Sequence, residues 1–327
     1  MKRLYAGSAL AAVCILGAAA IWFFGKDDGF VRLDGGTFRM GSDRHYQEER
    51  AAHQVTVGAF QIKKTEVTNA EFAEFVAETD YVTTAESDLD PQKYPGVPAY
   101  LLKAGSMVFA QPPNPVDSRD FRKWWRYVAG ANWRHPLGPE STIDGMENHP
   151  VVQISPEDAA AYAKWAGGRL PTEAEWEFAA RGGMDGNEYT WGEGYDPSQG
   201  WKANTWQGEF PNTDTRDDGY HGTAPVGSFA PNAYGLFDMA GNVWEHVSDW
   251  WVPFHTAGTQ DNPQGPPKAI AATFADPSVG PMHVVKGGSW LCAPSYCLRY
   301  RPAARQQAET SLATNHVGFR IVKDVSP

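Results

Sequence analysis

An uncharged stretch from Leu4 to Phe24 opens the chain, directly after Lys2 and Arg3. As a helix rising ~1.5 Å per residue it would span ~31 Å, which is the thickness of a bilayer's hydrocarbon core. The preceding positive charges place its N-terminus inside the cell. We expect residues 1–25 to be a signal anchor, because apolar residues continue past the small-residue site Ala18–Ala20. A cleaved signal peptide is the alternative, and both place the remaining chain outside the cytoplasm.

Three helices are predicted where a capping pattern precedes apolar residues at helical spacing. Thr68–Glu71 and Thr172–Glu175 both read Thr-x-x-Glu, the pattern of a capping box. Ser155–Asp158 supplies an N-cap, a proline at the first helical position and an acidic first turn. The second helix should stop at Gly167–Gly168 and the third at Gly182–Gly183.

Short β-prone runs surround these helices and predict several small strands. They are Gly35–Gly41, Gln54–Val57, Phe60–Ile62, Val284–Val285 and Phe319–Val322. Segments 80–150 and 184–283 show almost no periodicity and are rich in Gly, Pro, Asn, Asp and Trp. No linker or repeat interrupts the chain after residue 30. We therefore predict one α+β domain, residues 26–325, with little regular secondary structure and long ordered loops.

The composition excludes several classes of protein. With 42% hydrophobic and 13% aromatic residues the chain can bury a large core, so it is not a disordered protein. Its 39 Asp and Glu outnumber 28 Lys and Arg, giving a net charge of -11, which argues against nucleic acid as a partner. Only 3 cysteines are present, so it is not a disulfide scaffold. Cys14 lies in the uncharged leader, where it acts as a small apolar residue.

Cys292 and Cys297 are the remaining cysteines. A spacing of five places them about 140° apart on a helix and on opposite faces of a strand. Pro294 disfavours a helix between them, so only a turn would bring their sulfur atoms together. Three interpretations remain open: a small structural disulfide, a redox-active dithiol, or a low-coordinate thiolate site that suits Cu(I) better than Zn(II).

Oxygen donors are concentrated between residues 204 and 245. They are Asn204, Asp214, Asp217, Asp218, Asp238, Asn242 and Glu245. Oxygen-only clusters in loops favour Ca²⁺, although the spacing does not match an EF-hand. Solvated acidic loops are the alternative, but loops of this length need something that holds them in one conformation.

Several motifs resemble those of the formylglycine-generating enzymes, also called sulfatase-modifying factors, over nearly all of residues 30–322. Gly-Arg-Leu-Pro-Thr-Glu-Ala-Glu-Trp-Glu at 168–177 and the run ending Gly-Asn-Val-Trp-Glu at 232–245 are typical of the wider superfamily. Gly130–Pro136 and the run Gly-Gly-Ser-x-x-Cys-x-x-x-x-Cys-x-Arg-Tyr-Arg at 287–301 are typical of the formylglycine-generating branch. Further similarity lies at Gly35–Gly41 and Asn315–Arg320.

The resemblance implies a C-type-lectin-like fold and a reaction. The family oxidises a cysteine in a Cys-x-Pro-x-Arg segment of an unfolded sulfatase to Cα-formylglycine, with O₂ and a thiol reductant. Carried over by position, Cys292 and Cys297 would ligate Cu(I), and Ser289, Trp244 and Tyr296 would line the pocket. A soft, low-coordinate ion leaves room for the substrate sulfur, and aromatic walls exclude water.

The resemblance also implies two Ca²⁺ sites. Asn204, Asp218 and the carbonyls of Thr205 and Tyr220 would form one site. The other would consist of Asp238, Glu245 and the carbonyls of Gly241 and Val243. Vertebrate relatives carry extra structural cysteines, whose matching positions here include Ala163 and Ile321. Both ends of one such bridge are therefore absent together.

The leading hypothesis is an exported or membrane-anchored copper oxidase that matures sulfatases. Two alternatives accompany it. One is a superfamily oxidase that matures another exported peptide or metabolite. The other is a membrane-anchored binding module without catalysis.

Overall fold

The computed structural model describes residues 29–92 and 94–325. The predicted signal anchor at residues 1–25 lies outside the described residues. Within the described part of the chain, no helix combines the length and apolarity that a membrane crossing requires.

The three predicted helices form with the predicted caps. Helix α1 (Asn69–Thr79), α2 (Pro156–Trp165) and α3 (Glu173–Arg181) each begin with a reciprocal capping box, in which side chain and backbone satisfy one another. Gly182 ends α3 in the left-handed conformation. A fourth helix, α4 (Lys268–Ala271), is a single turn. Short 3₁₀ turns occupy Gln47–Glu49, Thr84–Glu86, Ala99–Leu102, Phe121–Lys123 and Pro197–Gln199.

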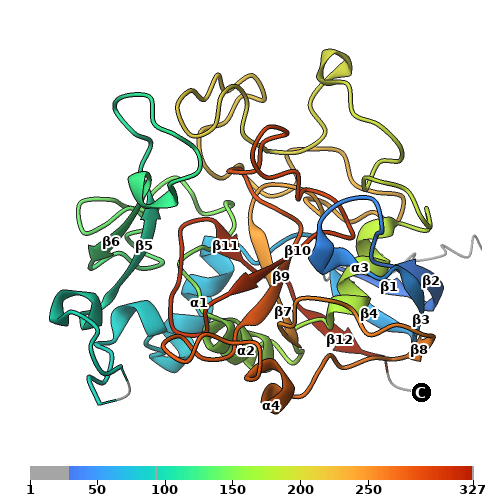
Figure 1. Cartoon of the computed structure of the whole chain (residues 1–327), viewed down its shortest axis with the longest axis horizontal. Coiled ribbons are helices and arrows are strands. Elements are labelled where there is room, and N and C mark those ends of the chain that lie inside the picture. The colour runs from blue at the N-terminus through green and yellow to red at the C-terminus, as the bar shows by residue number, and fades with distance from the viewer. Residues whose placement is uncertain (1–28, 93, 326–327) are drawn as a thin grey trace, which may run out of the picture.

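A four-stranded sheet in the order β10-β9-β7-β11 lies at the centre of the molecule (Figure 1). Its strands are β7 (Trp244–Trp250), β9 (His283–Lys286), β10 (Arg305–Ala308) and β11 (Val317–Gly318). β9 pairs antiparallel with both β7 and β10, whereas β11 pairs parallel with β7.

Three smaller sheets surround this central sheet. One contains β1 (Phe30–Leu33), β4 (Phe60–Lys63) and β12 (Val322–Asp324). Another contains β2 (Gly36–Met40), β3 (His53–Val57) and β8 (Gln260–Asp261). The hairpin of β5 (Gly105–Phe109) and β6 (Trp125–Ala129) lies on the other side of the central sheet in Figure 1.

Two details of the expected pattern were wrong. The run Phe319–Val322 is not one strand, because β11 ends at Gly318 and β12 begins at Val322, in a different sheet. The chain crosses between the sheets here, so buried apolar residues continue without strand pairing. Segment 80–150 also contains β5 and β6, and segment 184–283 contains β7, although neither segment has a clear period of two.

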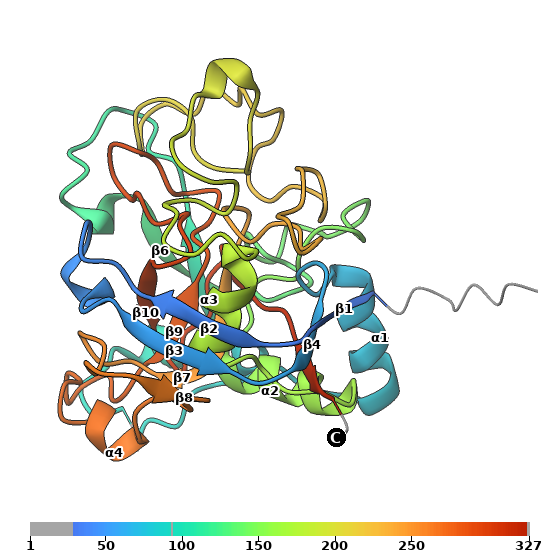
Figure 2. The same ribbon diagram turned by 90° about the vertical axis from the view of Figure 1, so that its right-hand side faces the viewer.

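The mixed α and β architecture with few helices agrees with the predicted fold class. One core cluster packs α3 against β2, β3 and β4, and a second packs α1 and α2 around Phe319. Much of segment 184–240 forms loops that extend from one end of the molecule, opposite the end that carries α4 and β8 (Figure 2). The cysteine segment 287–301 follows β9 out of the central sheet.

Candidate active site

Cys292 and Cys297 meet in a turn, as the spacing and Pro294 predicted. The Cys292 N–H donates to the Ser289 carbonyl and the Cys297 N–H donates to the Ala293 carbonyl, each over 2.8 Å. The two sulfur atoms lie 2.9 Å apart, and both residues are free cysteines. Cys292 is buried and Cys297 is partly exposed, so one sulfur is sealed in the protein and the other lies nearer to solvent.

Gly288 makes the turn possible. Its φ of +73° is unfavourable for other residues, and a Cβ there would lie 2.9 Å from the backbone of Tyr300. The two ends of the cysteine segment can therefore approach closely, which closes the segment into a compact loop.

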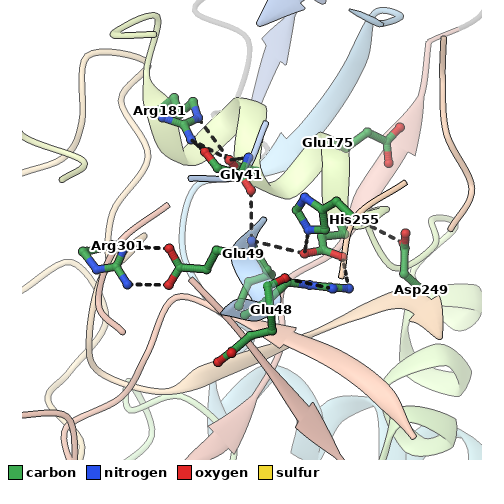
Figure 3. A network of polar contacts seen from close by, with 12 residues as sticks. Gly41, Glu48, Glu49, Glu175, Arg181, Asp249, His255 and Arg301 are labelled. Carbon is green, nitrogen blue, oxygen red and sulfur yellow. Dashed lines mark hydrogen bonds and ion pairs between the residues drawn. The ribbon is translucent and has the colours of Figure 1, made fainter. Parts of the chain in front are cut away.

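Two arginines of the same segment anchor it to the turn at Gln47–Glu49. Arg299 pairs with Glu48 at 2.7 Å, and the guanidinium of Arg301 donates to both carboxylate oxygens of Glu49, with Nη1 2.9 Å from Oε2 (Figure 3). Arg301 and Glu49 are both buried, and such bidentate pairs fix orientation strongly. The cysteine loop is therefore held at its C-terminal end by a part of the chain that is distant in sequence.

The two thiols differ in acidity. Burial raises the pKa of Cys292 well above its usual range, and the neighbouring Cys297 raises it further. The pKa of Cys297 is lowered, mainly by a hydrogen bond from Cys292 and also by the positive charge of Arg299. The pair therefore favours a thiolate at Cys297 next to a thiol at Cys292, and thiolates are the reactive and metal-binding form of cysteine.

A cavity of about 510 Å³ opens over the pair. The predicted pocket residues Ser289, Trp244 and Tyr296 all line it together with both cysteines. Tyr296 stacks on Phe210 with ring centroids 4.2 Å apart, and this aromatic pair forms part of the cavity lining. The structure thus brings together all five residues that the resemblance assigned to the copper pocket.

The sequence interpretation missed other cavity residues, above all His316. Its Nδ1 lies 3.0 Å from the Ser289 hydroxyl oxygen, and burial lowers the pKa of His316 to about 3, so the ring is neutral. Trp124 and Trp125 also line the cavity, from the segment that showed no periodicity. His316 lies within the run 315–320 that carried part of the resemblance, so that run was the available signal.

The first predicted calcium set is close together but already has protein partners. The Asp218 carboxylate accepts the backbone N–H groups of Thr205 and Tyr220, and the Gln207 amide donates to the Thr205 carbonyl. Burial raises the pKa of Asp218, which is the cost of an anion without a nearby cation. The Thr205 carbonyl oxygen has a second lone pair, so it can still ligate a cation beside the hydrogen bond from Gln207.

The second predicted set contains more negative charge than the sequence indicated. Glu245 forms a buried ion pair with Arg320, at 2.6 Å, and also accepts from the Trp176 indole. Glu66, distant in sequence, joins Asp238 and Glu245 there. Burial and the charge of Asp238 raise the pKa of Glu66 well above its ordinary value. Its Oε2 is buried and has no hydrogen-bond partner among the described residues.

This arrangement has the charge that a divalent cation would neutralise. Three buried carboxylates face one guanidinium, that of Arg320. Within the described residues, however, no group of three or more His, Cys, Asp or Glu side chains is already arranged around a common metal position. The donors fit Ca²⁺ by type and charge, since Ca²⁺ prefers carboxylate and carbonyl oxygens.

The loop between Asp238 and Glu245 contacts the cysteine loop directly. The Gly241 N–H donates to the Gly287 carbonyl, and the Trp290 N–H donates to the Asn242 carbonyl, both over 2.9 Å. The Asn242 side chain in turn donates to Glu66 and accepts from Asn204. The carboxylate cluster therefore supports the backbone from which the cysteine turn begins.

Comparison with known proteins identifies the family of this chain. Residues 24–325 match the family described as the sulfatase-modifying factor enzyme 1-like domain. The chain belongs to this family. It is similar to the formylglycine-generating enzyme of Mycobacterium tuberculosis, with 52% identity over 90% of this chain and 97% of that protein. The predicted family is thereby confirmed.

Membership of the family does not by itself establish activity. A relative in Bos taurus is named inactive C-alpha-formylglycine-generating enzyme 2, and is 37% identical over 90% of this chain and 88% of its own length. The structure of PvdO from Pseudomonas aeruginosa has the same fold, with a TM-score of 0.63 and 24% identity over 90% of this chain and 94% of PvdO. The function must therefore be argued from the site.

Proposed function

We propose that this protein is a copper-dependent oxidase that converts the cysteine of a Cys-x-Pro-x-Arg segment in unfolded sulfatases to Cα-formylglycine. The observation that carries the proposal is the pair of free thiols, 2.9 Å apart, at the base of an aromatic cavity. Relatives named formylglycine-generating enzymes, among them proteins 52% and 43% identical to this chain, supply the reaction class.

The thiols suit Cu(I) by chemical type, because soft thiolates stabilise this ion and it accepts low coordination numbers. Cys292 and Cys297 would hold it, and Arg299 favours the thiolate form of Cys297. When bound, Cu(I) supplies the activation of O₂. Overall, the substrate thiol, O₂ and a pair of electrons with their protons give the aldehyde, hydrogen sulfide and water. A pair of reductant thiols provides the electrons and becomes a disulfide.

The surrounding residues prepare the cavity for that reaction. Tyr296, Phe210 and Trp124 contact one another and line the cavity together with both cysteines, and such an aromatic lining would limit the access of water to a bound substrate. The Ser289 hydroxyl and the neutral ring of His316 share one proton in a hydrogen bond at the cavity wall. This pair can donate or accept a hydrogen bond toward a bound substrate without adding a charge.

Calcium is the second part of the proposal. One ion would use Asn204, Asp218 and the carbonyls of Thr205 and Tyr220. The other would use Asp238, Glu245 and the carbonyls of Gly241 and Val243, and Glu66 adds negative charge that the sequence interpretation did not include. Such ions would stiffen long loops and, through Gly241 and Asn242, the start of the cysteine loop.

The proposal also includes where in the cell the domain works, and this part rests on the sequence of residues 1–25 alone. The domain would work on the outer side of the cytoplasmic membrane, anchored by that segment, or be exported if the segment is cleaved. Sulfatases would then be modified at or after export, before they fold.

A peptide assay tests the proposed function. The purified protein is loaded with Cu(I) and incubated with O₂, a thiol reductant and a Cys-x-Pro-x-Arg peptide, and the product is weighed by mass spectrometry. We expect an aldehyde product from the natural protein and a loss of at least ~100-fold in Cys297→Ser. Cys14→Ser is the matched control, because Cys14 lies outside the domain. Full activity in Cys297→Ser, or no aldehyde from a folded, copper-loaded protein, would contradict the proposal.

A further inference from the structure

One acidic side chain on the wall of the cysteine cavity has no role in the chemistry described so far. Of the described residues that line this cavity, Glu309 is the one carboxylate. It is partly buried and forms neither a hydrogen bond nor an ion pair with another described residue. Burial raises the pKa of Glu309, and no neighbouring cation lowers it again. Without a hydrogen bond or an ion pair, this carboxylate contributes no polar interaction that would stabilise the fold.

The positive charge already in the cavity does not compensate Glu309. Arg299 is the one arginine or lysine among the described lining residues, and its guanidinium pairs with Glu48 at 2.7 Å while lying 3.8 Å from the Tyr46 ring centroid. The cavity therefore presents an unpaired anionic position to whatever enters it.

Strand register sets the separation between Glu309 and the point where the cysteine segment leaves the central sheet. Arg305 at the start of β10 pairs with Lys286, and the cysteine segment begins at the next residue, Gly287. Glu309 follows the other end of β10, four residues further along, which is about 13 Å at ~3.3 Å per residue. An extended Cys-x-Pro-x-Arg segment separates the Cα atoms of its cysteine and its arginine by four residues, or about 13 Å, so it is long enough to extend along a cavity wall that carries both cysteines and Glu309.

We propose that Glu309 is the specificity residue of the cavity, the carboxylate that pairs with the arginine of the substrate segment while the substrate cysteine reaches Cys292 and Cys297. The inference rests on the proposed function and deepens it. A guanidinium pairs with a carboxylate through directed, charge-assisted hydrogen bonds, and a partly buried carboxylate without a competing cation makes that pairing strong. Peptides that lack the positive charge would leave Glu309 desolvated and unpaired.

Binding and turnover together test the assignment. Affinity is measured with a Ser-x-Pro-x-Arg peptide, which lacks the reactive sulfur, and with the same peptide carrying glutamine in place of arginine. The natural protein should prefer the arginine peptide by about 10-fold or more, and Glu309→Gln should lose most of that preference. With the cysteine peptides, kcat/KM for the arginine form should fall by a similar factor, mainly through KM.

A charge exchange and a control variant sharpen the test. Glu309→Arg should bind a peptide ending in glutamate better than one ending in arginine, reversing the preference. Glu157→Gln is the matched control, since Glu157 is a carboxylate of α2 whose pKa is also raised by burial, and it lies outside this cavity. It should retain the arginine preference.

The outcomes separate this inference from the proposed function. Equal preference for arginine in the natural protein and in Glu309→Gln would overturn the role of Glu309, even if aldehyde forms normally. Binding that depends on Glu309 without any aldehyde would support the arginine contact and overturn the oxidase proposal instead.

Discussion

Two buried clusters of charged side chains lie near the cysteine loop and are built differently. The α3 cluster contains Glu173, Glu177 and Asp249 together with Arg181, Lys286 and Arg305. Figure 3 shows part of it, with Arg181, Asp249 and His255 near α3. The Arg320 cluster contains Glu66, Asp238 and Glu245 together with Arg320 alone. The first is balanced in charge, and the second has two carboxylates in excess.

The pKa values follow this difference. Burial opposes ionisation of Glu173, but Arg305 and Lys286 lower the pKa of Glu173 well below its usual range. Glu66 is equally buried, yet its pKa is raised because Asp238 adds to the effect of burial and Arg320 only partly opposes it. Glu173 and Glu177, which form direct ion pairs, thus stay ionised, whereas Asp249 of the same cluster forms no ion pair with another described residue and its pKa is raised. Where cations are too few, the site is poised to take up a proton or a metal ion.

Removing one positively charged side chain from each cluster should have the largest effect on the free energy of unfolding. Arg320→Met leaves three buried carboxylates without a counter-ion and should destabilise the calcium-free protein by ~3–5 kcal/mol. Lys286→Met in the α3 cluster should cost about the same, because it leaves Glu177 with only Arg181. Denaturant unfolding with and without Ca²⁺ measures both. Calcium should recover part of the loss in Arg320→Met only, and equal recovery in both variants would remove the distinction between the clusters.

Calcium removal should have the next largest effect. At ~100 times its dissociation constant, bound Ca²⁺ would stabilise the natural protein by ~2.7 kcal/mol, and a chelator would abolish this. Glu66→Gln should bind Ca²⁺ more weakly, because one negative charge is lost, while its calcium-free form should be the more stable one.

Glu177→Gln serves as the matched control for this experiment. It removes a carboxylate from the balanced cluster and should leave calcium affinity, measured by calorimetry, unchanged. If a chelator does not change the melting temperature of the natural protein, the calcium part of the proposal is contradicted.

The effect of pH on the free energy of unfolding should be smaller than the effects above, and it should differ between Glu66 and the ion-paired glutamates of the α3 cluster. Because the folded pKa of Glu66 is raised, the free energy of unfolding of the calcium-free protein should fall as pH rises from about 4.5 to that raised pKa, by ~1.4 kcal/mol per pH unit. Burial and Glu173 raise the pKa of Asp249 from 3.8 to about 7, so this group of the α3 cluster adds a further loss of stability as pH rises between these two values. For Glu173 and Glu177 the folded pKa is lowered, so their contribution is present above about 4.5 and is lost as pH falls.

Unfolding at pH 5 and pH 8 with a chelator measures these slopes. Glu66→Gln should flatten the decline between the two values, and Glu177→Gln should not. An unchanged slope in Glu66→Gln would show that Glu66 is already ionised or protonated throughout this range.

Local patterns allowed much of the fold to be anticipated. Three helices begin at the predicted caps, and the predicted strands of the N-terminal half form, because capping boxes and alternating apolar residues act over a few residues. Strand β7 and the hairpin β5–β6 were missed. β7 is buried along nearly its whole length, so it shows no alternation between polar and apolar positions.

In the candidate site, too, one part follows from the local sequence and another part depends on the tertiary structure. The cysteine spacing, Pro294 and the glycines of segment 287–301 determine a tight turn, since each acts within the segment itself. That both thiols face an aromatic cavity was decided by the tertiary structure, which brings Trp124, Phe210 and His316 to the same wall from three distant segments. No local pattern marks such residues.

The acidic residues show most clearly what the sequence determines and what only the tertiary structure decides. The sequence by itself determined the number of acidic residues and the oxygen-rich character of segment 204–245. Only the tertiary structure decided that Glu66 is buried beside Asp238 with too few cations, and that Glu309 lines the cysteine cavity unpaired. The reason is physical: the energy of a carboxylate depends on its solvation and on charges within a few ångströms, and folding sets both.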